Sequence, residues 1–486
     1  MALYELMGEV IEKDLQFNSQ ADKDAWIKES NEWRLPYWDW AIHTGVPDLF
    51  RPLSVKLRAP LGPQGQQIDP EEKNNPLYRF QLKVEGVVTK MGDLPEPYTV
   101  HDVRPPGENF ALPWSQCSGT SRYGIKTSSP TPEESEGINN YEMVQKAIDS
   151  HKYYPMGSDS TRTNRDEREI SKHPVSDLVY RLLSNVNDWA SFASTITEND
   201  SGSPDWKQWI SLEYIHNNMH VFIGGGDFAE GIGHMMNVPA SAFDPIFYMH
   251  HCNVDRLYAI WQVLHKDSWF APGASPRATD PLTPFRHKID GNKVDYFDSN
   301  STRDLTTLGY QYDVLQRQTD ETDDEYVARI KKYVDETYHG TGDILLHDKD
   351  GLFKGKTTNL YDDYIINVQY DRYGYKQGVP YIIHFFFGAP VSKGQTPDPF
   401  PRHVGSVYTF SSPITSGAQA ADDVNVCPNC VKQHDDGVLS RAAVPLTIPL
   451  YSDATNEDIG DFDTPSPENV EKYLKENLSW VAVTVG

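Results

Sequence analysis

The chain has 486 residues, with 70 acidic against 44 basic side chains and a formal net charge of −26 at pH 7. This acidic balance argues against nucleic acid or an anionic membrane surface as a partner. No stretch is apolar over the length that a bilayer span requires, and the N-terminus lacks the basic-then-apolar pattern of a signal peptide, which favours an intracellular location. Four cysteines do not indicate a disulfide scaffold, and the length favours two domains.

The first half of the chain contains several predicted helices separated by loops. Residues 1–15 have the pattern of an amphipathic, acidic helix, and an aromatic block, WRLPYWDWA, follows at residues 33–41. Proline, glycine and charged residues from 51 to about 140 predict loops. Residues 141–151 and 175–195 have helical periodicity, and we expect these helices to join the N-terminal one in a bundle.

Two histidines, His216 and His220, are four residues apart in HNNMH. Residues 206–221 are predicted to be a helix that ends at a run of glycines from Gly224, so the two imidazoles share one face. Together they can hold one metal ion, and imidazole suits copper, zinc, iron and nickel. The motif alone is weak, because two of 16 histidines can fall four residues apart by chance.

A second segment, AFDPIFYMHHCNVDR at residues 242–256, strengthens the prediction of a metal site. Asp244 and Pro245 suit the start of a helix over 243–266. His250 and His251 are adjacent and therefore point about 100° apart, so at most one of them faces the same ion as His216 and His220. Asp255 lies four residues after His251, where it can accept the outer N–H of a metal-bound imidazole.

This second segment closely resembles the second-copper signature of the type 3 copper proteins, which are the tyrosinases, catechol oxidases and hemocyanins. The resemblance implies that His216, His220 and His251 hold one copper and that His250 is a structural neighbour. In the family two coppers, each on three imidazoles, bind O2, and monophenols are converted to o-diphenols and then to o-quinones, which form pigment. Residues 2–5, ALYE, resemble the segment that follows the last ligand of the first copper. The resemblance therefore implies that the first-copper ligands lie upstream of Met1.

The resemblance also assigns roles to four neighbours of the ligands. In relatives that accept monophenols, a glutamate and an asparagine at the positions of Glu213 and Asn217 hold a water that takes the phenol proton. Phenols have a pKa near 10, so a base is needed at neutral pH. Val238 and Val221 match residues that gate the mouth of the pocket. The alternatives are a solvated carboxylate for Glu213, a polar spacer for Asn217 and ordinary core packing for the two valines.

The resemblance divides the chain into three parts. Residues 1–315 match a copper domain closed by a Tyr-x-Tyr mark in LGYQYD, and residues 316–350 are interpreted as an exposed acidic linker, which is the cleavage site of latent fungal relatives. Residues 351–486 are expected to form an all-β, sandwich-like lid, with a hairpin over 361–388 and strands at 405–410 and 443–451. The fold class is thus a mostly α helical-bundle core with a C-terminal β lid.

Two features of the lid are tied to copper by the same resemblance. An aromatic side chain, Phe410 or else Tyr408, is a candidate to plug the copper pocket, although an aromatic in a strand core is an equal alternative. Cys427 and Cys430 form a CxxC pair that matches one thought to deliver copper in some fungal relatives. A disulfide or free thiols is the alternative.

The sequence therefore predicts a copper-dependent phenol oxidase of tyrosinase type that uses O2 and a small phenol. Three alternatives remain: a catechol or o-aminophenol oxidase on the same scaffold, a non-catalytic protein that binds a single copper, and an O2 carrier. The single-unit length and the acidic linker argue against the carrier.

Overall fold

The computed structural model describes most of the chain. The residues that it does not describe are 1, 14, 16, 18, 58–70, 97–98, 103–111, 150–173, 197–208, 227–230, 272–275, 291–292, 339–340, 342–361, 376–377, 390–402, 412–427, 455–466 and 485–486.

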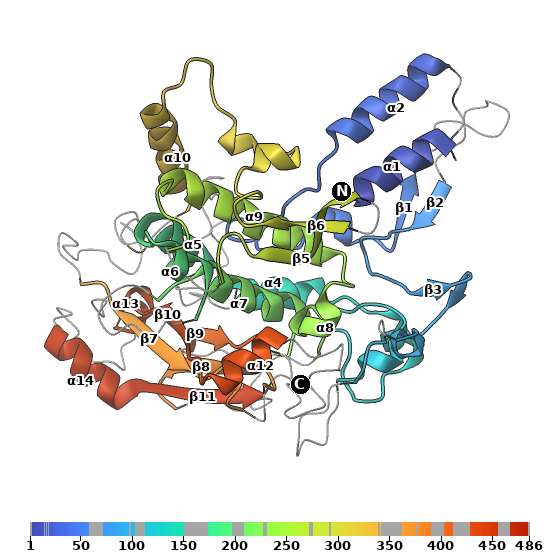
Figure 1. The fold of residues 1–486 in the computed structure, drawn as a ribbon. Helices are drawn as coiled ribbons and strands as arrows, with labels where there is room; N and C mark the ends of the chain where they lie inside the picture. Colours follow the sequence, from blue (N-terminus) through green and yellow to red (C-terminus); the bar gives the residue numbers. More distant parts are fainter. Residues whose placement is uncertain are drawn as a thin grey trace, which may run out of the picture.

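A group of helices forms the core of the first domain. Its members are α4 (Tyr141–Asp149), α5 (Pro174–Asn185), α6 (Trp189–Ala193), α7 (Leu212–Gly224), α9 (Ile246–Leu264) and α10 (Asp323–Thr337). Helix α7 is central because it contacts α4, α5, α6 and α9, while α10 covers α5 and α9 (Figure 1). Eleven of its 13 residues are buried, which is the pattern expected of a helix surrounded on all sides. The predicted bundle of helices is confirmed.

The N-terminal helix is not part of this bundle. Helix α1 (Ala2–Lys13) packs against α2 (Gln20–Glu32), and the two form an arm at the upper right of Figure 1. Helix α2 buries only Ser30, so it lacks the apolar stripe that would dock it on the core. The helix predicted over residues 1–15 is therefore confirmed, but its expected place in the bundle is wrong.

Short elements surround the core. They are η1 (Asp48–Phe50), η2 (Met91–Asp93), η3 (Trp114–Gln116), α3 (Pro132–Glu136), η4 (His234–Met236), α8 (Val238–Ser241), η5 (Leu305–Leu308) and η6 (Asp313–Leu315). Three antiparallel pairs accompany them: β1 (Ser54–Leu57) with β2 (Glu71–Asn74), β3 (Lys83–Val84) with β4 (Val87–Val88), and β5 (Pro281–Asp290) with β6 (Lys293–Asp298). The described part of residues 51–140 thus consists mainly of loops and short elements, as predicted.

The acidic stretch predicted to be a linker after the first domain is largely a helix of that domain. Residues 323–337 form helix α10 rather than an exposed linker, and a capping box between Thr322 and Glu325 begins the helix. Tyr326, Ile330 and Val334 are buried on its inner face. These apolar residues recur every four positions, which is a helical period. The many acidic residues around them made the stretch look like an exposed linker. Residues 339–340 and 342–350 of the predicted linker lie outside the described part of the chain.

The C-terminal domain is β-rich, as predicted. Its strands are β7 (Ile365–Tyr370), β8 (Tyr381–Phe387), β9 (His403–Tyr408), β10 (Ser440–Pro445) and β11 (Leu478–Thr484), and its helices are α12 (Pro428–Asp435), α13 (Thr447–Ala454) and α14 (Pro467–Asn477). One antiparallel sheet has the order β11-β8-β9, and β10 pairs with β7 in a second. The presence of these helices means that the domain is not all-β.

The hairpin predicted over residues 361–388 is wrong, although both of its strands exist. Strand β8 pairs with β9 and β11, and β7 pairs with β10. The sequence of β8, YIIHFFF, is buried along nearly its whole length. Side chains buried on both faces of β8 mean that both faces of the sheet are covered, and the strand order places β8 at the centre of its sheet.

The two domains share one hydrophobic core and meet along α7. Val407 of β9 belongs to the same cluster of buried side chains as Met219 of α7. The Tyr214 hydroxyl and the Asn218 Nδ2 donate to the Ser406 carbonyl at 3.1 and 3.2 Å. Strand β9 is therefore fixed directly on the helix that carries the HNNMH histidines.

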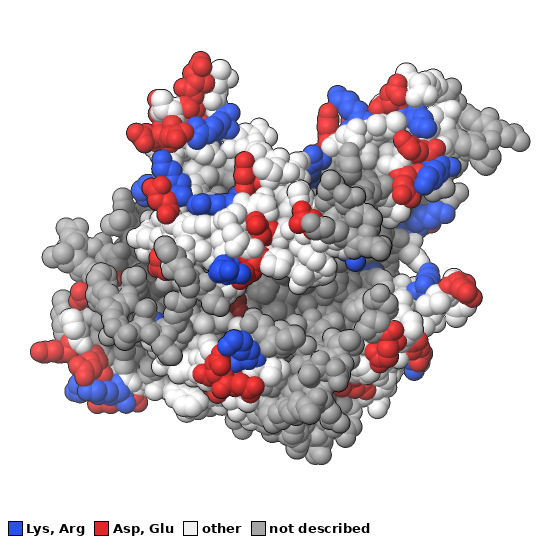
Figure 2. Space-filling model, in the orientation of Figure 1, with Lys and Arg blue, Asp and Glu red and all other residues white. Residues whose placement is uncertain are grey.

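The surface seen in Figure 2 mixes both signs of charge. Along α10 and α14, acidic and basic side chains lie four residues apart and form exposed pairs such as Lys331–Asp335 and Lys475–Glu471. Among the described helices, none is long and apolar enough to cross a membrane.

Candidate metal centre

Four histidines from two helices form the one group in the described part of the chain that could hold a metal ion. They are His216 and His220 of α7 and His250 and His251 of α9, and their ring nitrogens lie within 4.8 Å of one another. His220 and His250 are fully buried, while His216 and His251 are partly exposed. The two sequence segments therefore meet as predicted.

Three of the imidazoles point the same nitrogen at a common point. His216 Nε2 lies 3.0 Å from His220 Nε2 and 3.3 Å from His251 Nε2. Nitrogens that bind one ion at about 2.0–2.1 Å are separated by about 3 Å, which matches this spacing. The donor set is three neutral nitrogens, which suits copper or zinc equally.

Hydrogen bonds on the outer ring nitrogens fix the tautomers. His220 Nδ1 contacts the Met235 carbonyl at 2.6 Å, and His216 Nδ1 contacts Asn217 Oδ1 at 3.0 Å. Both partners accept, so each Nδ1 carries the proton and each Nε2 presents a lone pair. Asn217, predicted to help hold a water, thus orients a ligand in this structure.

Burial keeps these imidazoles neutral. It lowers the pKa of His216 and His220, and the neighbouring imidazoles lower that of His220 further. Burial likewise lowers the pKa of His251 to about 3, with His216 adding to the effect. Because only a neutral imidazole binds a metal, the site is prepared for an ion at neutral pH.

His250 plays a different part. The Trp40 indole Nε1 donates to His250 Nδ1 at 3.1 Å. A neutral imidazole that accepts on Nδ1 carries its proton on Nε2, so neither nitrogen has a free lone pair. This agrees with the expectation that His250 is a neighbour of the ligands, and it explains why the aromatic block at residues 33–41 lies beneath the site.

Buried ion pairs hold both ends of the α9 motif. Arg122 Nε donates to Asp244 Oδ2 at 3.0 Å, and both side chains are completely buried. At the other end Arg256 Nη1 donates to Asp39 Oδ2 at 3.1 Å. Since removal of one partner leaves a buried charge uncompensated, these pairs fix where α9 places its histidines.

Asp255 has partners other than the expected imidazole. Its Oδ2 accepts hydrogen bonds from the hydroxyls of Tyr310 at 2.8 Å and Tyr312 at 2.5 Å. These are the two tyrosines of the LGYQYD mark. The mark therefore closes the domain by attaching its chain to α9, and Asp255 supports the helix rather than contacting a ligand.

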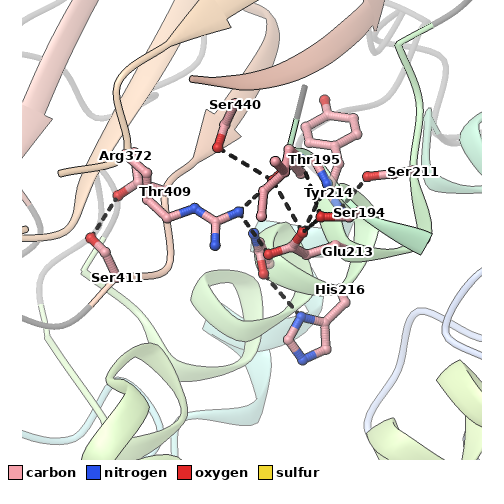
Figure 3. A network of polar contacts seen from close by, with 12 residues as sticks. Ser194, Thr195, Ser211, Glu213, Tyr214, His216, Arg372, Thr409, Ser411 and Ser440 are labelled. Atoms are coloured by element: carbon pink, nitrogen blue, oxygen red, sulfur yellow. Dashed lines mark hydrogen bonds and ion pairs between the residues drawn. The ribbon is translucent and has the colours of Figure 1, made fainter. Parts of the chain in front are cut away.

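Glu213 points toward the C-terminal domain. Its Oε1 accepts from Arg372 Nη2 at 2.7 Å, and its Oε2 accepts from the Thr195 backbone N–H at 2.8 Å (Figure 3). Burial alone would raise the pKa of Glu213, but Arg372 and these hydrogen bonds outweigh it and lower the pKa. The carboxylate is thus ionised and fully engaged, and sequence reasoning had no signal for Arg372.

The two valines predicted to form a gate lie in different environments. Val221 is 1% exposed and belongs to the hydrophobic core, whereas Val238 begins α8 and is 41% exposed. The packing of Val221 corresponds to the alternative considered for it, and the gating role of Val238 stays a prediction.

An aromatic ring covers the histidines. Phe410, which follows β9, stacks on His220 with ring centroids 4.0 Å apart and an interplanar angle of 21°, and it meets His216 edge-on at 5.5 Å. Tyr408, in contrast, is fully buried and donates its hydroxyl to the Met236 carbonyl. Of the two candidates for a plug, Phe410 has the required position. Of the CxxC pair, Cys430 lies in the first turn of α12 near Tyr373, and Cys427 lies outside the described residues.

Comparison with known proteins identifies the family. The model of the common central domain of tyrosinase matches residues 10–264, and the model of the tyrosinase C-terminal domain matches residues 363–486. A tyrosinase from Aspergillus fumigatus is 32% identical over an alignment that covers 99% of this chain and 73% of the relative. The chain belongs to the tyrosinase family.

Other relatives and solved structures agree with this assignment to the tyrosinase family. Polyphenol oxidase 2 of Agaricus bisporus is 24% identical, with 97% of this chain and 72% of the relative aligned. The crystal structure of holo-protyrosinase from Aspergillus oryzae superposes with a TM-score of 0.69 at 28% identity, covering 99% of this chain and 73% of that one. The protein is therefore a tyrosinase-like oxidoreductase of a copper-binding, phenol-oxidising family, with a helical core and a β-rich C-terminal domain.

Proposed function

We propose that the chain binds copper through His216, His220 and His251 and acts as a phenol oxidase of tyrosinase type. In this function it hydroxylates monophenols and oxidises o-diphenols to the o-quinones from which pigment forms. The observation that carries the proposal is the convergence of three Nε2 atoms under an aromatic ring. Bound copper would supply the activation of O2, and the second copper of the family needs ligands beyond this cluster.

The contacts of Phe410 support an aromatic substrate. Its ring lies flat on His220 and edge-on to His216, so a planar six-membered ring fits over the imidazoles. Phe410 is fixed by strand β9, whose Tyr408 backbone N–H donates to Asn218 Oδ1 at 3.0 Å. With Phe410 in this position a phenol is excluded, so the structure represents a closed form.

Catechol oxidation without monophenol hydroxylation is the second candidate function. It is favoured by the engagement of Glu213, because a carboxylate bound by Arg372 is a poor base for a phenol proton. Single-copper binding without catalysis is the third, since the described residues contain one suitable cluster.

Copper stoichiometry and steady-state rates on tyrosine and on catechol separate the three. Turnover of both substrates supports the tyrosinase type, and turnover of catechol alone supports the second candidate. About one copper per chain with no turnover of either substrate, in a variant with the pocket opened by Phe410→Ala, supports the third.

A further inference from the structure

The carboxylate of Glu213 is held on both oxygens at the boundary between the two domains. Besides Arg372 and the Thr195 backbone, it accepts a hydrogen bond from the Ser194 hydroxyl at 3.0 Å (Figure 3). Glu213 belongs to the first turn of α7, three residues before His216. Its negative charge raises the pKa of that imidazole and partly offsets the effect of burial. The site helix and the contact between the domains therefore share one acidic side chain.

Arg372 reaches this carboxylate from the C-terminal domain, in the segment between β7 and β8. Its side chain is 11% exposed, and its Nη2 donates to the Thr195 hydroxyl as well as to Glu213. Burial opposes the charge on Arg372, but Glu213 and nearby tyrosines raise its pKa. The Glu213 side chain is 26% exposed, and a charged hydrogen bond between two such mostly buried side chains is stronger than a neutral one.

The segment around Thr195 lies between the two partners. Its carbonyl accepts from the Arg441 backbone N–H at 2.7 Å, and Ile196 forms a bridge with Ser440. The other contacts that the described residues make between α7 and the C-terminal domain are neutral hydrogen bonds and apolar packing. Among the described residues a second ion pair joins the domains, with Arg181 Nη1 at 2.5 Å from Asp363 Oδ2; its side chains are 4% and 34% exposed, against 11% and 26% for Arg372 and Glu213.

We propose that Arg372 is a latch that closes the C-terminal domain by holding Glu213, and that closure at the same time withdraws this carboxylate from the copper site. Phe410 and Arg372 then inhibit in two ways: the first covers the imidazoles, and the second occupies the group that would position the water for a phenol proton. The second part rests on the proposed function, whereas the first does not.

Hydrogen exchange tests the latch without any activity. The probes are residues 194–196 and the Tyr408 backbone N–H, which bonds across the boundary, and helix α9 is the internal reference. In Arg372→Gln we expect exchange at the probes to rise about tenfold or more, since a buried charge loses its partner. The matched control is Arg441→Gln, because the Arg441 guanidinium stacks on Trp209 at 4.6 Å in the same boundary and should change exchange less than about twofold.

Two results would overturn the latch. One is exchange in Arg372→Gln no faster than in Arg441→Gln. If Arg372→Gln instead loses protection in α9 as well, Arg372→Lys decides, since it keeps a charge for Glu213 but cannot also reach Thr195 with a planar fork. Because Arg372→Lys keeps the charge opposite Glu213, protection restored at the probes and in α9 supports the latch, and exchange at the probes as fast as in Arg372→Gln rejects it.

The ratio of two rates tests the withdrawal of Glu213. In copper-loaded Arg372→Gln, the rate on tyrosine should rise at least about threefold more than the rate on catechol, relative to Arg441→Gln. Equal rises on both substrates would leave Arg372 as a latch and reject the withdrawal. Faster exchange with no turnover in any variant would support the latch and contradict the phenol oxidase.

Discussion

His216, His220 and His251 each direct a neutral nitrogen at the same point, and two of them are held there by a hydrogen bond on the other side of the ring. Replacement of any one by alanine should lower copper affinity at least about 100-fold, because a site with two imidazoles loses its closed geometry. Equilibrium dialysis with atomic absorption measures this. The control is His43→Ala, which removes an exposed histidine, and undiminished copper binding in the three ligand variants would contradict the assignment.

The burial of His234 predicts that the stability of the fold depends on pH. It is fully buried, accepts the Ser121 backbone N–H on Nδ1 at 3.1 Å, and burial lowers its pKa from 6.5 to about 3. Between pH 6.5 and about 3, His234 is protonated in the unfolded state but not in the folded state. The free energy of unfolding therefore falls as the pH drops below about 6.5. From pH 6.5 to 4.5 this one group should cost about 2 kcal/mol.

His234→Asn isolates this effect, because the asparagine oxygen can replace Nδ1 as the acceptor. Urea unfolding at the two pH values should show a smaller loss of stability in the variant, by about 2 kcal/mol. Equal losses in the two proteins would assign the acid sensitivity to other groups.

Site residues could be predicted from the sequence where they lie a few positions apart on one helix. The spacing of His216 and His220 places them on one helix face, whereas the choice of His251 over His250 came from the resemblance of the HHCNVDR motif to the second-copper signature. Arg372 is 159 residues from Glu213 and comes from another domain, so no local pattern could pair them. Asp255 was assigned to an imidazole for the same reason: its tyrosine partners are 55 and 57 residues away.

At the scale of elements, α9 depends on the chain that follows it. Tyr312 donates to Asp255 and to the Cys252 carbonyl, at 2.5 and 2.9 Å. Tyr312→Phe leaves a partly buried carboxylate with one fewer donor and should destabilise the fold by about 1–3 kcal/mol. Urea denaturation measures this, with Tyr248→Phe as control because Tyr248 is 45% exposed. Equal stability of the two variants would show that the LGYQYD segment does not support the helix.

Helices were predicted better than strand pairing or the acidic stretch. Apolar period identified α4 and α5, whereas the histidine spacing with its glycine run and the Asp-Pro start indicated α7 and α9. Pairing of β8 with β9 and β11 could not be predicted, because a short apolar run specifies a strand without its partners. Likewise, α10 was missed because charge dominated the composition around its few buried side chains.

At the scale of the whole molecule, the C-terminal domain closes the site through one ring. Phe410→Ala should remove the cover and, in the copper-loaded chain, raise the rate on catechol at least about tenfold, because the pocket becomes accessible while β9 keeps its bonds to α7. Phe285→Ala is the matched control, since Phe285 is 66% exposed on β5. A rate unchanged from that of the unmodified chain would mean that closure does not depend on Phe410.

The hydrogen bond between Trp40 and His250 has a practical consequence. It places an indole, itself fully buried, one side chain away from the imidazoles that receive the ion. Cupric ions quench nearby tryptophan emission, so the difference in fluorescence between the native chain and Trp40→Phe would record metal uptake directly. The emission of Trp40 thus reports how far the metal site is filled, and the measurement needs neither a dye nor catalytic turnover.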